Sequence, residues 1–382
     1  MVTSVKRLFI FLICFFVGVF NVFAKGDVCN QRHCIAVVDA GSSGSRLHIF
    51  AYDVEQDNSP ININELWSKK IKPGFATVDL TQDKINSYID NLFKDSPENN
   101  IPVYFYATAG MRLLSNEQQQ LYYQALERWF NNQNDWQLAE AKTITGSDEG
   151  IYGWLAVNYQ LGSFDSYSKQ LANVIDIGGA SAQVTFPVED IANIAPDDLQ
   201  SIDVYGKHIN LFAHSFLGLG QTLITQQFIN DENCFAKGYQ LPNGSFAKGD
   251  ARSCEREIAK YIVNVHEVNK LVQPVLLDNT GRWYAIGGAA TLVDEKILSL
   301  DGRKFTSEDL LQLGDDEICH QPWKDLTLKY PGNDYLYGYC FFPSYYYALF
   351  VEGYGIDKNT PINIMSADKS ADWTLGVVLH KH

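Results

Sequence analysis

Two segments of the chain combine an aspartate with glycines and small hydroxyl residues, a composition suited to holding phosphate groups. The first segment begins at Asp39 and reads DAGSSGSR, and the second begins at Asp176 and reads DIGGASAQ. Glycine has no Cβ, so backbone N–H groups can converge on an anion in such turns, and serine hydroxyls add further donors. The predicted phosphate-binding residues are Gly41, Ser42, Ser43, Gly44, Ser45 and Arg46 in the first segment and Gly178, Gly179 and Ala180 in the second.

The two aspartates would repel a phosphate group if nothing lay between them. A divalent cation, Mg²⁺ or Ca²⁺, removes this conflict if Asp39 and Asp176 hold it directly or through its bound waters. The sequence therefore predicts a pair of metal-associated carboxylates. Taken singly, each segment is equally compatible with an ordinary tight hairpin that carries a turn-favouring aspartate.

The two segments also form an internal repeat. Residues 38–41 (VDAG) match residues 175–178 (IDIG), and Gly44 and Arg46 stand opposite Ser181 and Gln183 at the same interval. In both copies the order is strand, aspartate, glycine loop and second strand. The duplication predicts that the two loops face each other across one site. Neither loop is a Walker phosphate loop, because the GxxxxGK[ST] pattern is missing and a strand follows instead of a helix.

Other polar residues lie near predicted element ends and can complete such a site. Glu149 stands at a strand-to-helix junction, where a carboxylate can accept a proton from a water that attacks phosphorus. Its alternative role is that of an acidic residue favoured by the helix macrodipole. Thr108 and Gln183 are neutral groups that can orient this water, and Arg112, like Arg46, can offset phosphate charge or simply be solvated.

Hydrophobic patterning predicts the elements that position these residues. Buried strands are expected at 35–38, 103–107 and 283–286, and the alternating residues 46–52 form the return strand of the first hairpin. Helices are expected at 116–130 and after Gly150, where apolar residues recur at helical spacing. The aromatic residues between 335 and 347 can stack a flat base or fill the core.

The composition favours a two-lobed globular protein. The chain has 382 residues, 46% of them hydrophobic, which is too long for one typical core. The net charge of −15 argues against nucleic acid or anionic lipid as a partner. Anionic substrates must therefore meet local positive potential from backbone amides, a metal ion or a few basic side chains.

The N-terminus and the cysteines indicate export. Lys6 and Arg7 precede an apolar run that ends near a small-residue cleavage site, so residues 1–24 are expected to be a secretory signal cleaved after Ala24, with an uncleaved anchor as the alternative. We expect a secreted or periplasmic protein without a stable membrane anchor. Six cysteines follow, which allow 15 disulfide connectivities. Pairing of neighbours closes short local loops and predicts Cys29–Cys34, Cys234–Cys254 and Cys319–Cys340.

Five motifs together resemble the nucleoside triphosphate diphosphohydrolases, the ecto-apyrase family, and in particular a secreted bacterial member. The motifs occur in the family's order and span nearly the whole chain after the signal. They are DAGSSGSRLHIF at 39–50, YATAGMRLL at 106–114, GSDEGIYGWLAVNY at 146–159, DIGGASAQVTF at 176–186 and ADWTLG at 371–376.

The resemblance implies a two-lobed α/β fold like that of actin, hexokinase and heat-shock ATPases (ribonuclease H-like), with the active site in the interlobe cleft. The expected domains are lobe I at 25–147 plus 367–382 and lobe II at 148–366. The resemblance also implies activation by Mg²⁺ or Ca²⁺ held mainly through water, and nucleoside tri- and diphosphates as substrates. We expect the protein to be a monomer. Carried over by motif, Glu149 is the general base, Thr108, Ser181 and Gln183 surround the attacking water, and Asp39, Asp176 and Trp373 lie near the metal waters.

Two departures from the family pattern affect the substrate. Gly44 stands where many cell-surface animal members carry histidine, and Gly287-Gly288-Ala289-Ala290 replaces the family's paired aromatics. Base stacking must then come from elsewhere, and Tyr346 and Tyr347 are the candidates from the aromatic segment. The expected activity is stepwise hydrolysis of ATP to ADP to AMP by in-line attack of water. The alternatives are an exopolyphosphatase, a sugar kinase or a non-catalytic nucleotide-binding module of the same fold.

Overall fold

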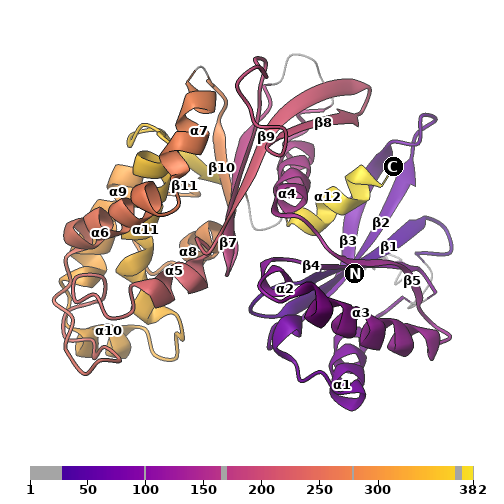
Figure 1. Ribbon diagram of the computed structural model, residues 1–382, viewed down its shortest axis with the longest axis horizontal. Coiled ribbons are helices and arrows are strands. Elements are labelled where there is room, and N and C mark those ends of the chain that lie inside the picture. Colours follow the sequence, from indigo (N-terminus) through magenta and orange to yellow (C-terminus); the bar gives the residue numbers. More distant parts are fainter. Residues whose placement is uncertain (1–27, 99, 165–169, 278, 366–371, 382) are drawn as a thin grey trace, which may run out of the picture.

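Two mixed β-sheets form two lobes that face each other across a pair of helices (Figure 1). The computed structural model describes residues 28–98, 100–164, 170–277, 279–365 and 372–381. The predicted signal at 1–24 lies outside these residues. Among the described helices, none is both long and apolar enough to cross a bilayer.

The first lobe has a five-stranded sheet in the order β3-β2-β1-β4-β5. Its strands are β1 (His33–Ala40), β2 (Ser45–Val54), β3 (Pro60–Ile71), β4 (Pro102–Ala107) and β5 (Gln137–Thr143). The amphipathic helices α1 (Gln82–Phe93) and α3 (Asn116–Asn131) bury their apolar faces on one side of this sheet, and the short helix α2 (Ala109–Arg112) follows β4. Ser115 begins α3 with a capping box, which explains why the helix starts where the sequence predicts it.

The second lobe has a seven-stranded sheet in the order β11-β12-β10-β6-β7-β9-β8. Its strands are β6 (Asn173–Ile177), β7 (Ser181–Pro187), β8 (Leu199–Val204), β9 (Lys207–Leu217), β10 (Trp283–Gly287), β11 (Lys304–Phe305) and β12 (Ile362–Ile364). Its helices are α5 (Gln221–Gln227), α6 (Ala251–Asn264), α7 (Val268–Leu276), α8 (Gly288–Asp294), α9 (Ser307–Gly314), α10 (Trp323–Lys329) and α11 (Phe341–Tyr347). Short 3₁₀ or π segments lie at Phe75–Thr77 in the first lobe and at Asp315–Cys319, Leu336–Tyr339 and Ala348–Gly353 in the second.

The internal repeat is present in three dimensions. Strands β1 and β2 form an antiparallel hairpin in which Asp39 pairs with Arg46, and β6 and β7 form one in which Asp176 pairs with Gln183. Each hairpin is then joined by a parallel strand, β4 beside β1 and β10 beside β6. The carboxyl ends of β1 and β6 therefore carry equivalent loops, as the sequence predicts.

Helices α4 (Gly146–Gln160) and α12 (Trp373–His380) lie between the two sheets (Figure 1). α4 packs on β6, β7 and β9 of the second sheet, whereas α12 packs on α4 and on β1 and β2. A Cβ on Gly376 would lie 1.9 Å from the Tyr152 carbonyl oxygen, so only glycine permits this close crossing. α12 thus contacts both the first sheet and α4, and the division into lobe I at 25–147 plus 367–382 and lobe II at 148–366 stays a prediction.

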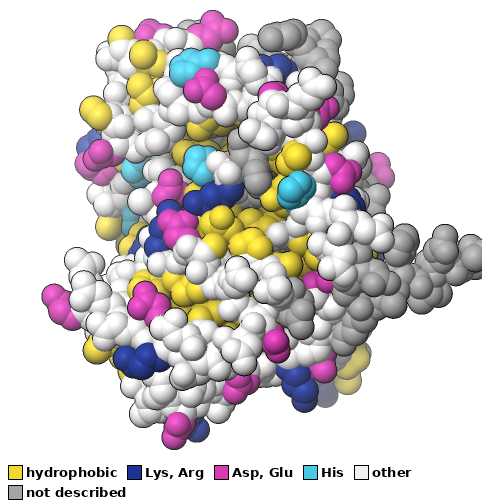
Figure 2. Space-filling view, turned by 90° about the vertical axis from the view of Figure 1, so that its right-hand side faces the viewer, with side chains coloured by type: hydrophobic (Ala, Val, Ile, Leu, Met, Phe, Trp, Pro, Cys, Tyr) yellow, Lys and Arg dark blue, Asp and Glu magenta, His cyan; other side chains and the backbone are white. Residues whose placement is uncertain are grey.

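Three disulfides link the predicted neighbours. They are Cys29–Cys34, Cys234–Cys254 and Cys319–Cys340, and the last two lie in the buried core of the second lobe. On the side shown in Figure 2, basic side chains lie among acidic ones.

Candidate active site

A cleft of about 560 Å³ lies between the lobes, and both repeated loops line it. Its walls at the loop end combine the residues that follow β1, β4 and β6 with the start of α12. Lining residues from the predicted site are Asp39, Gly41, Ser42, Ser43, Gly44, Ser45, Arg46, Thr108, Glu149, Asp176, Gly178, Gly179, Ala180, Ser181 and Trp373.

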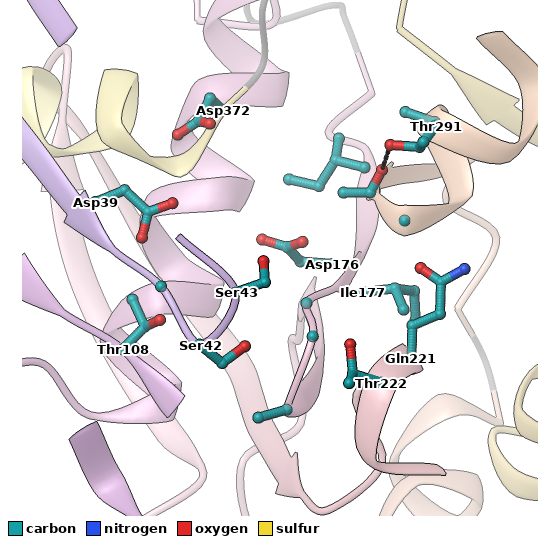
Figure 3. Close-up of a pocket in the computed structure, with 18 of the residues that line it drawn as sticks. Asp39, Ser42, Ser43, Thr108, Asp176, Ile177, Gln221, Thr222, Thr291 and Asp372 are labelled. Carbon is teal, nitrogen blue, oxygen red and sulfur yellow. Dashed lines mark hydrogen bonds between the residues drawn. The ribbon is translucent and has the colours of Figure 1, made fainter. Parts of the chain in front are cut away.

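The two glycine loops approach each other closely across the cleft. A Cβ placed on Gly179 would lie 2.5 Å from Ser42 Oγ, so a side chain at 179 would collide with the first loop. Figure 3 shows Ser42 and Ser43 of the first loop directed toward the second loop, with Thr222 of α5 beyond it. The two loops thus form opposite walls of one narrow space, as the repeat predicts.

Asp39 and Asp176 point into this space from opposite lobes (Figure 3). Burial raises the pKa of Asp39 well above its usual range; the carboxylates of Asp372 and Glu149 raise it further, and Arg46 lowers it. Burial likewise raises the pKa of Asp176, with Glu149 and Asp372 adding to the effect. The carboxylates therefore repel one another across the cleft, which the basic residues Arg46, Lys70 and Arg303 also line.

Glu149 lies in the first turn of α4 and is only 6% exposed. Thr145 begins this helix with a capping box, which fixes the turn that carries Glu149. Glu149 Oε2 accepts hydrogen bonds from Arg112 Nη2 at 2.5 Å and from Gln183 Nε2 at 3.0 Å. Burial raises the pKa of Glu149, and the Arg112 guanidinium opposes this rise.

Ser181 and Gln183, which both belong to β7, lie beside Glu149 of α4. Gln183 Nε2 also donates to Ser181 Oγ at 2.7 Å, and Arg112 Nη2 donates to the same hydroxyl at 3.2 Å. Thr108 lines the cleft from the first lobe, and its backbone N–H donates to the Ala40 carbonyl at 3.2 Å. Three of the four predicted catalytic residues, Thr108, Glu149 and Ser181, thus line the cleft, whereas Gln183 does not line it and contacts Glu149 and Ser181 instead.

Asp372 is a fourth cleft carboxylate that the sequence analysis did not select. It caps α12 by accepting from Thr374 N at 3.0 Å, immediately before Trp373. Burial works against its ionisation, but His48, the Thr374 N–H and Arg46 together lower the pKa of Asp372. Its signal in the sequence was the Asp-x-Thr capping pattern at the start of a short apolar helix.

The structure does not place Tyr346 and Tyr347 at the cleft. Tyr346 is fully buried in the core of the second lobe and stacks on Phe350, and Tyr347 packs near Arg252. Their helix, α11, packs on α6 and α9 within this core. The aromatic residues of the segment 335–347 that do line the cleft are Tyr335, Tyr339 and Phe342, and Tyr335 is 49% exposed.

The cleft residues fit a divalent cation held through water. Asp39 Oδ1 and Gln183 Oε1 are buried and accept no hydrogen bond from any described residue. Within the described part of the chain, one trio of acidic or histidine residues, Asp315, Asp316 and His320, has its ligand atoms within 4.8 Å of one another, and it does not line the cleft. No three carboxylates of the described cleft residues bring their ligand atoms this close together, so water molecules would complete the coordination of an ion held here.

Comparison with known proteins agrees with this geometry. Residues 27–249 match the GDA1/CD39 (nucleoside phosphatase) family. The chain is 28% identical to ectonucleoside triphosphate diphosphohydrolase 1 of Rattus norvegicus over 90% of this chain and 80% of that protein, and 26% identical to probable apyrase 3 of Arabidopsis thaliana over 92% and 82%.

Solved structures show the same fold. Nucleoside triphosphate hydrolases from Neospora caninum superpose with a TM-score of 0.61 at 15% identity, covering 92% of this chain and 94% of that one. The Ppx/GppA protein of Aquifex aeolicus superposes with a TM-score of 0.55 at 15% identity, covering 91% and 97%. The family match covers more than half of the chain, and the paired loops face each other across the cleft. The chain therefore belongs to the GDA1/CD39 (nucleoside phosphatase) family.

Proposed function

We propose that this protein is an apyrase that hydrolyses the terminal phosphates of nucleoside tri- and diphosphates by in-line attack of water, without a phosphoenzyme. The observation that carries the proposal is the pair of opposed Asp–Gly loops, with the Glu149 carboxylate lining the same cleft. The names of the relatives support the same substrate class.

In this proposal the glycine loops hold the transferred phosphoryl group from both sides. Backbone N–H groups of the two loops and the hydroxyls of Ser42 and Ser43 bind its oxygens, and Arg46 adds positive charge. Asp39, Asp176 and Asp372, with Trp373 beside them, would hold Mg²⁺ or Ca²⁺ mainly through water. When bound, the cation withdraws charge from the phosphoryl oxygens.

Glu149 takes the proton of the attacking water. Its Oε2 is occupied by Arg112 and Gln183, whereas Oε1 accepts no hydrogen bond from the described residues. We therefore assign the base to Oε1. The water oxygen bonds to the terminal phosphorus, the bond from phosphorus to the bridging oxygen breaks, and the products are orthophosphate and a nucleotide shortened by one phosphate.

The nucleoside would lie toward the outer part of the cleft, where Tyr335, Tyr339 and Phe342 replace the earlier candidates Tyr346 and Tyr347. The half-exposed ring of Tyr335 offers a face for a base. Gly287 and Gly288 also line the cleft and contribute no aromatic ring to it.

We also propose that the protein is exported and acts as a monomer. The three disulfides and the N-terminal pattern support export, since disulfides persist in oxidising compartments. Secretion of a tagged full-length chain, with N-terminal sequencing of the product, tests cleavage after Ala24.

One assay tests the function: phosphate release from ATP, ADP, AMP, GTP and UTP with Mg²⁺, Ca²⁺ or a chelator. We expect release from the tri- and diphosphates, none from AMP and none with chelator. Release from long polyphosphate but not from ATP would replace the proposal with an exopolyphosphatase. Nucleotide binding without release would indicate a non-catalytic module.

A further inference from the structure

His48 is a buried histidine of β2 that reaches toward the cleft without lining it. It is 1% exposed and stacks on Phe50 with 5.8 Å between the ring centroids. None of the roles proposed above uses this residue. A buried imidazole with a polar atom lacking a partner needs an explanation, because leaving a buried polar group unsatisfied destabilises the folded state.

Both edges of the His48 ring face carboxylates. Nδ1 lies 3.0 Å from Glu65 Oε1 on the neighbouring strand β3. Nε2 lies 3.8 Å from Asp372 Oδ2 and has no hydrogen-bond partner among the described residues. The ring therefore lies between the partly exposed Glu65 on β3 and Asp372 at the cleft, with one nitrogen directed at each carboxylate.

Two basic side chains, Arg46 and His48, lie at the same distance from Asp372. Arg46 Nη1 also lies 3.8 Å from Asp372 Oδ2, but the Arg46 side chain is 39% exposed and stands in the phosphate-binding loop. An arginine that turns to a phosphate group leaves Asp372. His48 is held by Glu65 and by Phe50, so it stays beside Asp372 whether or not a substrate is bound.

We propose that His48 is a positioning residue that holds the Asp372 carboxylate toward the metal waters, and that Glu65 in turn holds His48. This inference rests on the proposed function, because Asp372 matters here as a partner of the metal's water shell. Outer partners of this kind typically change metal affinity or activity by about 10- to 100-fold when removed. The histidine acts electrostatically on both carboxylates, since His48 lowers the pKa of Glu65 and helps to lower the pKa of Asp372.

The test compares His48→Phe and Glu65→Gln with a matched control, His214→Gln. His214 also pairs with an aspartate, Nδ1 to Asp198 Oδ1 at 2.6 Å, and also packs on a phenylalanine, but it does not line the cleft. Two quantities are measured for each protein. One is the free Mg²⁺ concentration that gives half-maximal ATP turnover, and the other is the rise in Tm that Mg²⁺ causes in the presence of a non-hydrolysable ATP analogue.

We expect His48→Phe to raise the half-maximal Mg²⁺ concentration about tenfold and to reduce the Mg²⁺-induced rise in Tm, with KM for ATP little changed at saturating Mg²⁺. Glu65→Gln should shift both quantities in the same direction by a smaller factor, and His214→Gln should shift neither. A merely structural role would lower Tm in all conditions but leave the response to Mg²⁺ unchanged, which would overturn the inference.

If His48→Phe does not fold, the Glu65→Gln variant tests the inference instead. The Glu65 side chain is 26% exposed, so its replacement leaves the core intact. An unchanged Mg²⁺ response in that variant would also overturn the inference. The Tm readout needs no turnover, so wild-type inactivity on nucleotides would reject the proposed function separately.

Discussion

Arg112 of the first lobe and Glu149 of α4 form a buried ion pair, with 2.5 Å between Nη2 and Oε2. The two side chains are 15% and 7% exposed, so the pair is largely removed from solvent. The contact occupies one oxygen of the carboxylate and offsets the effect of burial on its charge. The sequence left open whether Arg112 offsets phosphate charge or is solvated, and the structure makes it a partner of the proposed base.

Replacement of Arg112 by Gln should therefore impair the base. We expect kcat/KM to fall about 10- to 100-fold, since a hydrogen bond to a charged group contributes about 1.5–3 kcal/mol. Without the guanidinium the pKa of Glu149 rises further, so the acidic limb of the pH profile of kcat/KM should move to higher pH. Arg112→Lys retains the charge and should move the limb less. An unmoved limb in Arg112→Gln would argue against this pairing.

Replacement of Glu149 by Gln should leave the fold intact and abolish most turnover. The amide keeps the size of the side chain but cannot take a proton, and loss of a general base costs about 10²- to 10⁴-fold in rate. Phosphate release at saturating ATP measures the effect, and circular dichroism checks the fold. Near-normal turnover would remove Glu149 from the mechanism, and a trapped radiolabelled phosphoprotein would contradict direct attack by water.

Replacement of Tyr335 by Ala should weaken nucleotide recognition specifically. Base–aromatic stacking contributes about 1–3 kcal/mol, so KM for ATP should rise about tenfold or more. Hydrolysis of inorganic tripolyphosphate, which has no base, should be unaffected, and Tyr335→Phe should behave like the wild type. An equal loss on both substrates would mean that Tyr335 acts on the cleft as a whole instead of on the base.

Glu255 of α6 should make stability depend on pH. Burial raises its pKa from 4.5 to about 7, and Glu352 adds to the rise while Arg256 and Arg252 oppose it. The folded state therefore keeps a proton that the unfolded state releases. The stabilising contribution of this protonated carboxyl is fully present below pH 4.5 and is lost as pH rises to about 7.

Glu255→Gln should thus raise the free energy of unfolding relative to the wild type more at pH 8 than at pH 5. The difference should be about 2 kcal/mol after allowance for partial solvent screening. Urea unfolding at both pH values measures this difference. The matched control is Glu257→Gln on the same helix, whose side chain is 48% exposed and pairs with Lys260 at 2.6 Å. Equal pH dependence in wild type and Glu255→Gln would contradict the assignment.

Several features could be predicted from local sequence because they depend on local physical causes. The strand before Asp39, the capped start of the helix at Asn116 and the repeated hairpin all follow from side-chain pattern and turn chemistry, and the structure confirms them. The disulfides were also predicted correctly, because close spacing makes neighbouring cysteines the favoured partners.

Which residues share the cleft was decided by tertiary structure. Asp372 is far from Asp39 in sequence, and only the return of α12 between the two sheets brings its carboxylate to the cleft and to His48. Tyr346 and Tyr335 belong to one aromatic segment with no difference in residue type, but helix packing buries the first and leaves the second at the rim. Sequence pattern determines what each short segment can form, whereas long-range packing determines which side chains meet, because those contacts depend on how separate elements pack against one another.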